Sequence, residues 1–177
     1  VIQINPVEYY GMLTDTIGYI ALRDFTDKAY NEVRDAVIDL TKNHNMRKLI
    51  IDLRSNGGGL VSEAVNIAGL FVPRHTHIVS TKGLQPQSHQ EYVTSNEPLL
   101  PDLPLMVLIN SASASASEIL AGALQDLDRA IVVGERSYGK GLVQSLRPLP
   151  HNTYLKVTTA KYYIPSGRCV QAIDYAK

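Results

Sequence analysis

The hydrophobic positions of this chain change their spacing several times, from that of buried strands to that of amphipathic helices and back. Short apolar runs of strand length occur at 18–23, 47–53, 78–81, 104–110 and 130–134. Apolar positions instead recur every three or four residues at 24–43, 60–70 and 118–127, which predicts three helices. This alternation of strand and helix over most of the chain predicts an α/β fold in which sheets and helices form layers.

The remaining segments show neither a buried-strand run nor the helical spacing of hydrophobic residues. Residues 142–149 and 153–163 predict a pair of strands around Pro150-His-Asn, with a further turn at 163–167. Residues 82–104 are polar and contain prolines, so we expect an irregular excursion there. The paired tyrosines at 9–10 and 162–163 are expected to pack on half-buried strands rather than to form a binding surface.

Twice a predicted buried strand ends in a loop of small residues that opens a predicted helix. Strand 47–53 runs into the glycines at 57–59, and strand 104–110 runs into SASASAS at 111–117. Open α/β sheets place their sites at such strand-to-helix loops. We therefore expect the functional site to be built from these two loops.

Length and composition exclude several classes of function. The 177 residues predict a single domain, 1–177, and the 17 basic and 17 acidic residues balance without a basic stripe for nucleic acid. The apolar runs are too short to span a membrane. The single Cys169 rules out an internal disulfide and a cysteine-rich metal site. The chain starts without Met or a signal segment, so we expect a mature form or an excised piece.

We expect no metal and no organic cofactor. His75 and His77 have a spacing that would suit a metal ion, but no third ligand is evident, and exposed loop histidines are far commoner. The oligomeric state is not encoded in any pattern that we can identify in the sequence.

The serine run has two interpretations. Serine is a favourable helix N-cap, so the run has a purely structural explanation. Alternatively, one serine is a nucleophile whose developing charge is favoured by the helix N-terminus. The run by itself does not say which of its four serines that would be.

A nucleophilic serine needs a base, and lysine is a better candidate than histidine here. No histidine stands out and no G-x-S-x-G motif is present. Lys140, between two glycines, would act as a base if burial lowered its pKa, although Gly-Lys-Gly is also typical of a solvated turn. Gln144 lies four residues on, roughly on the same side of a helix or strand, where its amide would orient the amine.

The glycine loop also has several interpretations. It would cradle a phosphate, but it lacks the G-x-G-x-x-G spacing and the Walker lysine. Its amides would otherwise form an oxyanion hole, or the loop is simply a glycine-rich turn. Asp52 and Arg54 either pair to hold this loop or are surface charges.

Taken together, these loops resemble the carboxy-terminal processing peptidases, also called tail-specific proteases. The resemblance rests on four segments in order, DLRSNGGGL at 52–60, NSASASASEILAGAL at 110–124, GERSYGKGLVQ at 134–144 and KYYIPSGR at 161–168. It runs from about Gly18 to Gln171. The fold that it implies is the ClpP/crotonase-like α/β fold.

The resemblance also implies a role for individual residues. It places the nucleophile on Ser115, the base on Lys140 and the orienting group on Gln144. The oxyanion hole would use the Ala116 amide and a glycine amide of the first loop, which we assign to Gly58 with Gly59 as the alternative.

The activity implied is that of a serine endopeptidase that cleaves protein substrates near their C-termini through an acyl-enzyme. Two departures from the family are visible, because Gly57 stands where the family usually has proline, and neither a PDZ domain nor helical flanks lie within the 177 residues. The alternative functions are a non-catalytic binding module, like the retinoid-binding relatives, and a crotonase-like acyl-CoA enzyme. An envelope or periplasmic location is expected from the family alone.

Overall fold

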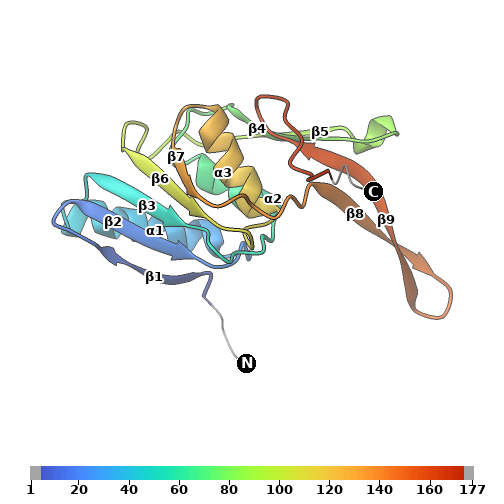
Figure 1. The fold of residues 1–177 in the computed structure, drawn as a ribbon, viewed down its shortest axis with the longest axis horizontal. Helices are drawn as coiled ribbons and strands as arrows, with labels where there is room; N and C mark the ends of the chain where they lie inside the picture. Colours follow the sequence, from blue (N-terminus) through green and yellow to red (C-terminus); the bar gives the residue numbers. More distant parts are fainter. Residues whose placement is uncertain (1–4, 174–177) are drawn as a thin grey trace.

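The short apolar runs form one predominantly parallel sheet in the computed structural model, which describes residues 5–173. Its strand order is β1-β2-β3-β6-β7 (Figure 1). The strands β2 to β7 in this list are parallel, and β1 adds an antiparallel edge. The bounds are Val7–Met12 for β1, Ile17–Leu22 for β2, Lys48–Asp52 for β3, Leu105–Ile109 for β6 and Ile131–Gly134 for β7.

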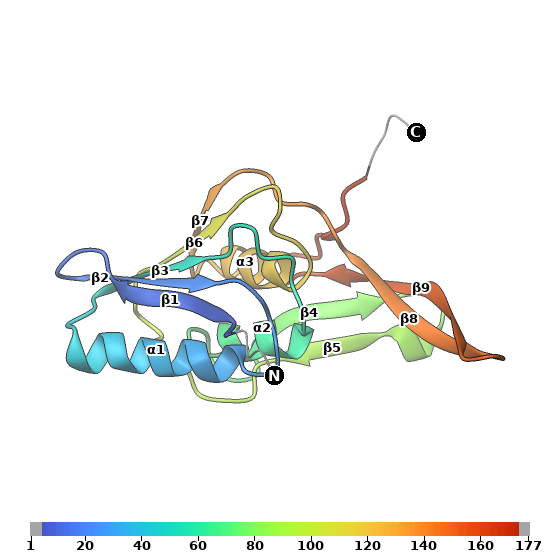
Figure 2. The ribbon, with the colours of Figure 1, turned by 90° about the horizontal axis from the view of Figure 1, so that it is seen from below.

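Within residues 5–173, three α-helices pack with this sheet and with one another in a single core. They are α1, Ala29–Asn43, α2, Val61–Ala68, and α3, Ala116–Asp126. Helix α1 contacts β1 and β2, whereas α3 contacts β7 of this sheet and β4 of a second sheet, so α3 lies between the two (Figure 2). Their buried faces join the strands in one continuous hydrophobic core, in which Phe25, Phe71 and Ile51 are fully buried. No helix within residues 5–173 is long and apolar enough to cross a membrane.

The second sheet is antiparallel and has the order β5-β4-β9-β8. Its strands are β4, His77–Lys82, β5, Gln90–Val93, β8, Leu142–Leu149, and β9, Thr153–Tyr163, with a short 3₁₀ helix η1 at Pro86–Ser88. The outer parts of β8 and β9 extend beyond the other strands as a two-stranded arm (Figure 1). We call residues 144–158 the β8–β9 arm.

The α/β class and the layered arrangement predicted from the sequence are confirmed. The predicted strand pair at 142–149 and 153–163 has the same bounds in the structure. Three differences have physical causes. Helix α1 begins at Ala29 rather than at residue 24, because Phe25 instead pairs with Gly59 in a β-bridge. The polar excursion at 82–104 contains β5, which pairs with β4, and the segment before β2 is itself the strand β1.

The parallel strands bring three loops to the same end of the sheet. Residues 53–60 follow β3, residues 110–115 follow β6, and residues 135–140 follow β7. Because β3, β6 and β7 are neighbours and parallel, their carboxyl ends lie side by side. The fold therefore places the glycine loop, the serine run and the Gly-Lys-Gly segment together.

Candidate active site

Ser115 lies at the junction between the loop after β6 and the first turn of α3. Its backbone has φ 58° and ψ −115°, a conformation that residues with a Cβ rarely adopt. Such strain costs about 1–3 kcal/mol and is found mostly at functional sites. The Ala116 amide, at the first position of the helix, donates no hydrogen bond to any residue in the described range. A free donor thus lies directly beside the serine at the positive end of the helix dipole.

The other serines of the run have structural tasks. The Ser113 hydroxyl donates to the Leu53 carbonyl at 2.8 Å, and the Ser117 hydroxyl donates to the Asn56 carbonyl at 2.9 Å. Both serines are fully buried, whereas Ser111 is an exposed loop residue. These hydrogen bonds tie the serine run to the glycine loop, and they leave Ser115 as the serine that the fold holds in a strained backbone beside a free amide.

A single carboxylate connects Ser115 to the lysine segment. Glu118 is 6% exposed. Its Oε2 atom accepts the amides of Ser115 and Lys140, both at 2.8 Å, and its Oε1 atom accepts the Gly139 amide at 2.6 Å. Because hydrogen bonds to a charged acceptor are stronger than neutral ones, this carboxylate fixes the two loops to each other.

The side chains of the predicted dyad do not yet form a hydrogen bond with each other, although the backbone amides of Ser115 and Lys140 are held by the same carboxylate. Lys140 and Gln144 are both exposed. Across residues 5–173, no hydrogen bond joins the Lys140 ammonium to Ser115 or to Gln144. The burial that a neutral lysine requires is therefore not present in this arrangement. The backbone around Lys140 is nevertheless packed, since a Cβ at Gly139 or Gly141 would come within 2.3 Å of the segment 171–172.

The glycine loop lies against Ser115. Gly58 has φ +102°, and a Cβ added there would lie 2.7 Å from the Ser115 Cβ and 3.0 Å from the Ala116 nitrogen. The Gly58 amide donates to the Asn56 Oδ1 atom at 2.9 Å. A Cβ on Gly59 would instead meet the Phe25 carbonyl oxygen at 2.5 Å, so Gly59 is needed for the contact with Phe25. Gly58 is thus the glycine that adjoins Ser115, although its amide is already partnered.

Asp52 and Arg54 pair, as one interpretation of the sequence held. The fully buried Asp52 carboxylate accepts three hydrogen bonds from the Arg54 side chain, two of them from Nε, one from the Arg54 amide and one from the Tyr19 hydroxyl at 2.5 Å. Burial opposes ionisation of this carboxyl, but these hydrogen bonds outweigh it and hold the pKa of Asp52 below its ordinary 3.8. Arg23 adds a donor to the Arg54 carbonyl, which further fixes the start of the loop.

Sequence reasoning missed the wider roles of Glu118, Asn56 and Tyr19. It predicted Glu118 only as a helix cap, and the contact with residues 139–140 depends on a chain segment more than twenty residues away. The Asn56 side chain accepts a hydrogen bond from the Gly58 amide. Its backbone carbonyl accepts hydrogen bonds from the Ala114 amide and from the Ser117 hydroxyl. The only sequence signal for these hydrogen bonds is that Asn56 precedes three glycines, a combination that also occurs in ordinary turns.

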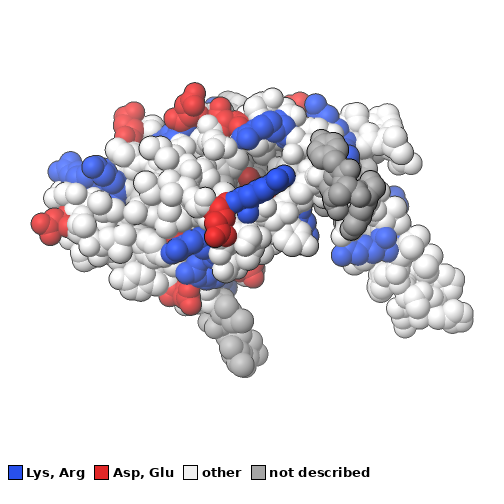
Figure 3. Space-filling model, viewed as in Figure 1, with Lys and Arg blue, Asp and Glu red and all other residues white. Residues whose placement is uncertain are grey.

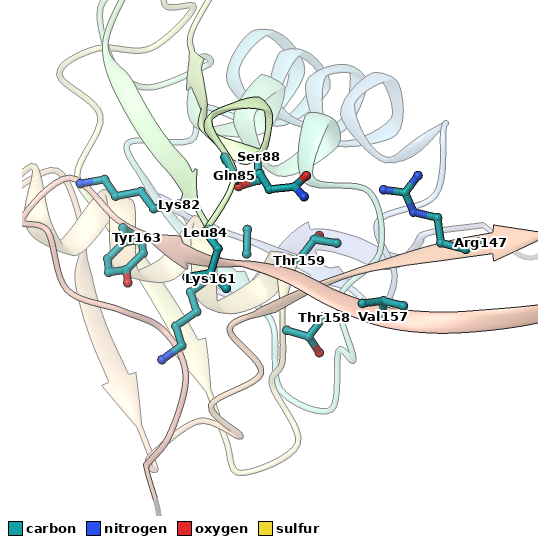
Figure 4. A pocket seen from close by; sticks show the side chains of 12 residues that line it. Lys82, Leu84, Gln85, Ser88, Arg147, Val157, Thr158, Thr159, Lys161 and Tyr163 are labelled. Carbon is teal, nitrogen blue, oxygen red and sulfur yellow. Dashed lines mark hydrogen bonds between the residues drawn. The ribbon is translucent and has the colours of Figure 1, made fainter.

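A cavity of about 590 Å³ lies outside this site. It opens between the end of β4 and strand β9, where Lys82, Lys161 and Arg147 border it (Figure 4). The Lys82 ammonium lies 5.3 Å from the Tyr163 ring centroid. No group of three or more potential metal ligands occurs in the described part of the chain, and the pair His75 and His77 remains without a third ligand.

Comparison with known proteins identifies the family of the chain. Residues 16–175 match the model of peptidase family S41. The chain belongs to this family. It is 40% identical over 176 residues to the carboxy-terminal-processing protease of Bartonella bacilliformis, with 98% of the chain and 40% of that protein covered. It is 47% identical over 150 residues to the carboxyl-terminal-processing protease of Synechocystis, with 85% and 34% covered.

Two further similarities agree with this assignment. A probable CtpA-like serine protease of Staphylococcus aureus is 36% identical over 172 residues, with 96% of the chain and 34% of that protein covered. The structure of a photosystem II D1 C-terminal processing protease matches with a TM-score of 0.86 and 32% identity, covering 96% of the chain and 46% of that structure. All four are proteases by name, and the chain spans between 34% and 46% of their lengths.

The ionised Asp52 carboxylate should stabilise the fold near neutral pH. Because its pKa is lowered on folding, this stabilisation is present above the unfolded value near 3.8 and is lost as the pH falls through the lower folded value. Asp52→Asn should reduce the free energy of unfolding by roughly 1–3 kcal/mol near pH 7, and this difference should shrink below pH 3.8. Urea unfolding at both pH values measures it, with the exposed Asp15→Asn as control. A pH-independent difference would contradict the assignment.

Substitution by alanine should have opposite effects on stability at Gly57 and Gly58, two adjacent glycines of the first loop. A Cβ at Gly57 meets nothing within 4 Å, so Gly57→Ala should raise the free energy of unfolding by about 0.4–1 kcal/mol and leave activity intact. Gly58→Ala combines a positive φ with a clash against Ser115, and should cost roughly 1–3 kcal/mol together with most of the activity. Thermal unfolding and peptidase assays on the two variants check this. Equal effects at both positions would show that the loop does not lie as described.

Removing the charge of Glu118 should separate the two loops. In Glu118→Gln, an amide NH₂ would face a backbone N–H, so we expect a loss of roughly 1–3 kcal/mol in the free energy of unfolding and slower reaction of Ser115 with a fluorophosphonate. Glu63→Gln is the matched control, because Glu63 is 9% exposed and accepts the Tyr30 amide away from the site. That control should lower stability without slowing the labelling of folded protein. Similar labelling rates in both variants would refute the special role of Glu118.

Proposed function

We propose that this domain is a serine endopeptidase that cleaves protein substrates near their C-termini by a Ser115–Lys140 dyad through an acyl-enzyme. The observation that carries the proposal is the shared Glu118 carboxylate, which holds the amides of both residues within one hydrogen-bonded unit. The membership of family S41 and the names of the relatives support the same class of reaction. Substrate tails as partners are likewise part of this proposal.

The reaction begins with neutral Lys140 accepting the proton of the Ser115 hydroxyl. The Ser115 oxygen then forms a bond to the scissile carbonyl carbon, and the carbonyl oxygen becomes the oxyanion. The free Ala116 amide is the better supported donor to this oxyanion, because it has no other partner among the described residues. Gly58 would be the second donor if its amide were released from or shared with Asn56, and Gly59 is the alternative.

The tetrahedral intermediate then collapses. The C–N bond breaks as Lys140 returns its proton to the leaving amine, and the acyl group stays on Ser115. Lys140 next takes a proton from water, whose oxygen attacks the ester carbon. Lys140 passes this proton to the Ser115 oxygen as the acyl–oxygen bond breaks, and the released carboxylic acid loses its own proton to water. Every proton passes through protein groups and water, so the proposal requires neither a metal nor an organic cofactor.

Assembly of the dyad requires a movement of side chains rather than of the chain. The Lys140 amide is already held by the same carboxylate as the Ser115 amide, so rotation of the lysine side chain would bring its amine toward the hydroxyl. Covering Lys140 would then disfavour its charged form, as the role of base requires. Gln144 would orient the amine in that state.

A non-catalytic binding module on the same fold is the alternative function. Such a module has no need of a strained serine beside an unpartnered amide, and strain of this kind persists where it serves the chemistry. A crotonase-like acyl-CoA enzyme would use an oxyanion hole without a nucleophile, and so would remain active without Ser115. The location in the cell envelope remains a prediction from the family.

Ser115→Ala should abolish labelling by a fluorophosphonate and lower the rate of β-casein cleavage by at least about 1,000-fold. Lys140→Ala should lower the cleavage rate to a similar extent, because the two groups act as a unit. Gln144→Ala should have a smaller effect. Mass spectrometry of the labelled protein and gel analysis of β-casein measure both results. Ser111→Ala and Lys42→Ala, at exposed positions, are the matched controls and should behave like the unmodified chain. Labelling of the Ser115→Ala variant at the normal rate would show that Ser115 is not the nucleophile.

A further inference from the structure

We propose that the open edge of β8 receives the substrate as an added β-strand, paired with the main chain of Gln144 and Leu146. This inference rests on the proposed function, because the bound chain is the peptidase substrate. It assigns the extended polypeptide to one particular edge and to particular backbone groups. Main-chain pairing of this kind accepts varied side chains, as a peptidase that acts on tails of different sequence requires.

The position of β8 in its sheet supports the proposal. Within residues 5–173, β8 is the last strand in the order β5-β4-β9-β8 and pairs only with β9. It begins two residues after Lys140, and it carries Gln144. The open edge therefore starts directly beside the candidate base and leads away from it along the β8–β9 arm (Figure 1).

The register shows which backbone groups this edge presents. Pro148 pairs with Tyr154 and has no N–H, so position 148 is one whose nitrogen faces away from β9. The Tyr162 amide donates to the Gly141 carbonyl, which places Gly141 among the positions that face β9. The hydrogen-bonding direction alternates along a strand, and both constraints agree. The N–H and C=O groups of Gln144 and Leu146 therefore point to the open edge.

The face of the arm next to this edge combines apolar side chains with uncharged polar ones and one cation, Lys156, which lies opposite Leu146. Gln144, Leu146 and Pro148 share one face of β8, since side chains alternate, and Tyr154 lies opposite Pro148 on the same face. The side chains of Leu146 and Tyr154 are 64% and 65% exposed. Residues 142–163 contain no Asp or Glu, and the arm is mostly white in Figure 3. An unfolded chain that is partly apolar and carries no cluster of positive charges fits this surface.

Pro148 limits the length of the pairing. An exposed edge strand pairs readily with any other strand, and a proline removes one of the donors that such pairing needs. The donors toward the open edge thus end at Leu146, which confines an added strand to the part of β8 nearest Lys140. A chain bound there would pass beside Lys140 and exclude water from it, which provides the burial that the dyad lacks in the free protein.

Amide hydrogen exchange tests the proposed edge without relying on turnover. In the Ser115→Ala chain mixed with β-casein, an unfolded protein, the amides of Gln144 and Leu146 should become protected, whereas those of Ser145 and Arg147 should be protected already. Protection that appears instead at the β7, β1 or β5 edge, or no new protection in β8, would overturn the proposal. Protection of β8 that grows with protein concentration in the absence of β-casein would also overturn it, because the arm would then pair with a second copy of the chain.

A pair of substitutions at one position separates main-chain pairing from side-chain packing. Leu146→Pro removes the outward N–H at a position equivalent to Pro148, so the ladder with β9 is kept, and Leu146→Ala removes the side chain but keeps the N–H. We expect Leu146→Pro to weaken binding of fluorescein-labelled β-casein at least about 10-fold, and Leu146→Ala to weaken it much less. Equal losses in both variants, with unchanged circular dichroism, would refute strand addition.

The failure of this inference and the failure of the proposed function are distinguishable. A fluorophosphonate is small and needs no paired strand, so its reaction with Ser115 tests the nucleophile alone. Normal labelling without protection of β8 would overturn only the strand addition. Protection of β8 without labelling of the Ser115 chain would overturn the peptidase mechanism and leave β8 only as an edge that binds an extended chain.

Discussion

The arrangement of the site depends on the carboxylate of Glu118. It is nearly buried, and it accepts the amides of Ser115, Gly139 and Lys140. An ionised carboxylate has acceptors only, and a buried charge is costly unless hydrogen bonds satisfy it, so the loop after β7 must come to the start of α3. This one constraint joins the end of two parallel strands, the first turn of a helix and the strand β8 that follows.

A second set of contacts holds the glycine loop against this unit. Asn56 binds the Gly58 amide, and its carbonyl takes a hydroxyl and an amide from the serine run, while Asp52 and Arg54 fix the start of the loop. The backbone of the candidate site is therefore preorganised, which the proposed stabilisation of an oxyanion requires. The side chain of Lys140 is not, because it lies in solvent. The molecule thus combines a rigid main-chain frame with one group whose environment a bound chain would change.

Much of the fold follows from local patterns. The apolar runs predict the parallel strands because a buried strand needs no alternation, and the pair β8 and β9 is recognisable from its turn residues. The start of α1 was not predictable, because Phe25 leaves the helical pattern to pair with Gly59, more than thirty residues away. Strand β5 was missed for the same reason, since a polar edge strand is defined by its neighbour β4 and not by its own sequence.

The sequence by itself determined the α/β class, the family and the segments that form the candidate site, since these depend on periodicity and on motifs along the chain. Tertiary structure decided the tasks of the individual serines, because only the folded chain shows that Ser113 and Ser117 bind the glycine loop while Ser115 stays strained beside a free amide. It also gave Glu118 its second role and, within residues 5–173, left the edge of β8 unpaired. Hydrogen bonds between distant segments carry no local signal, which is why the sequence could not show them.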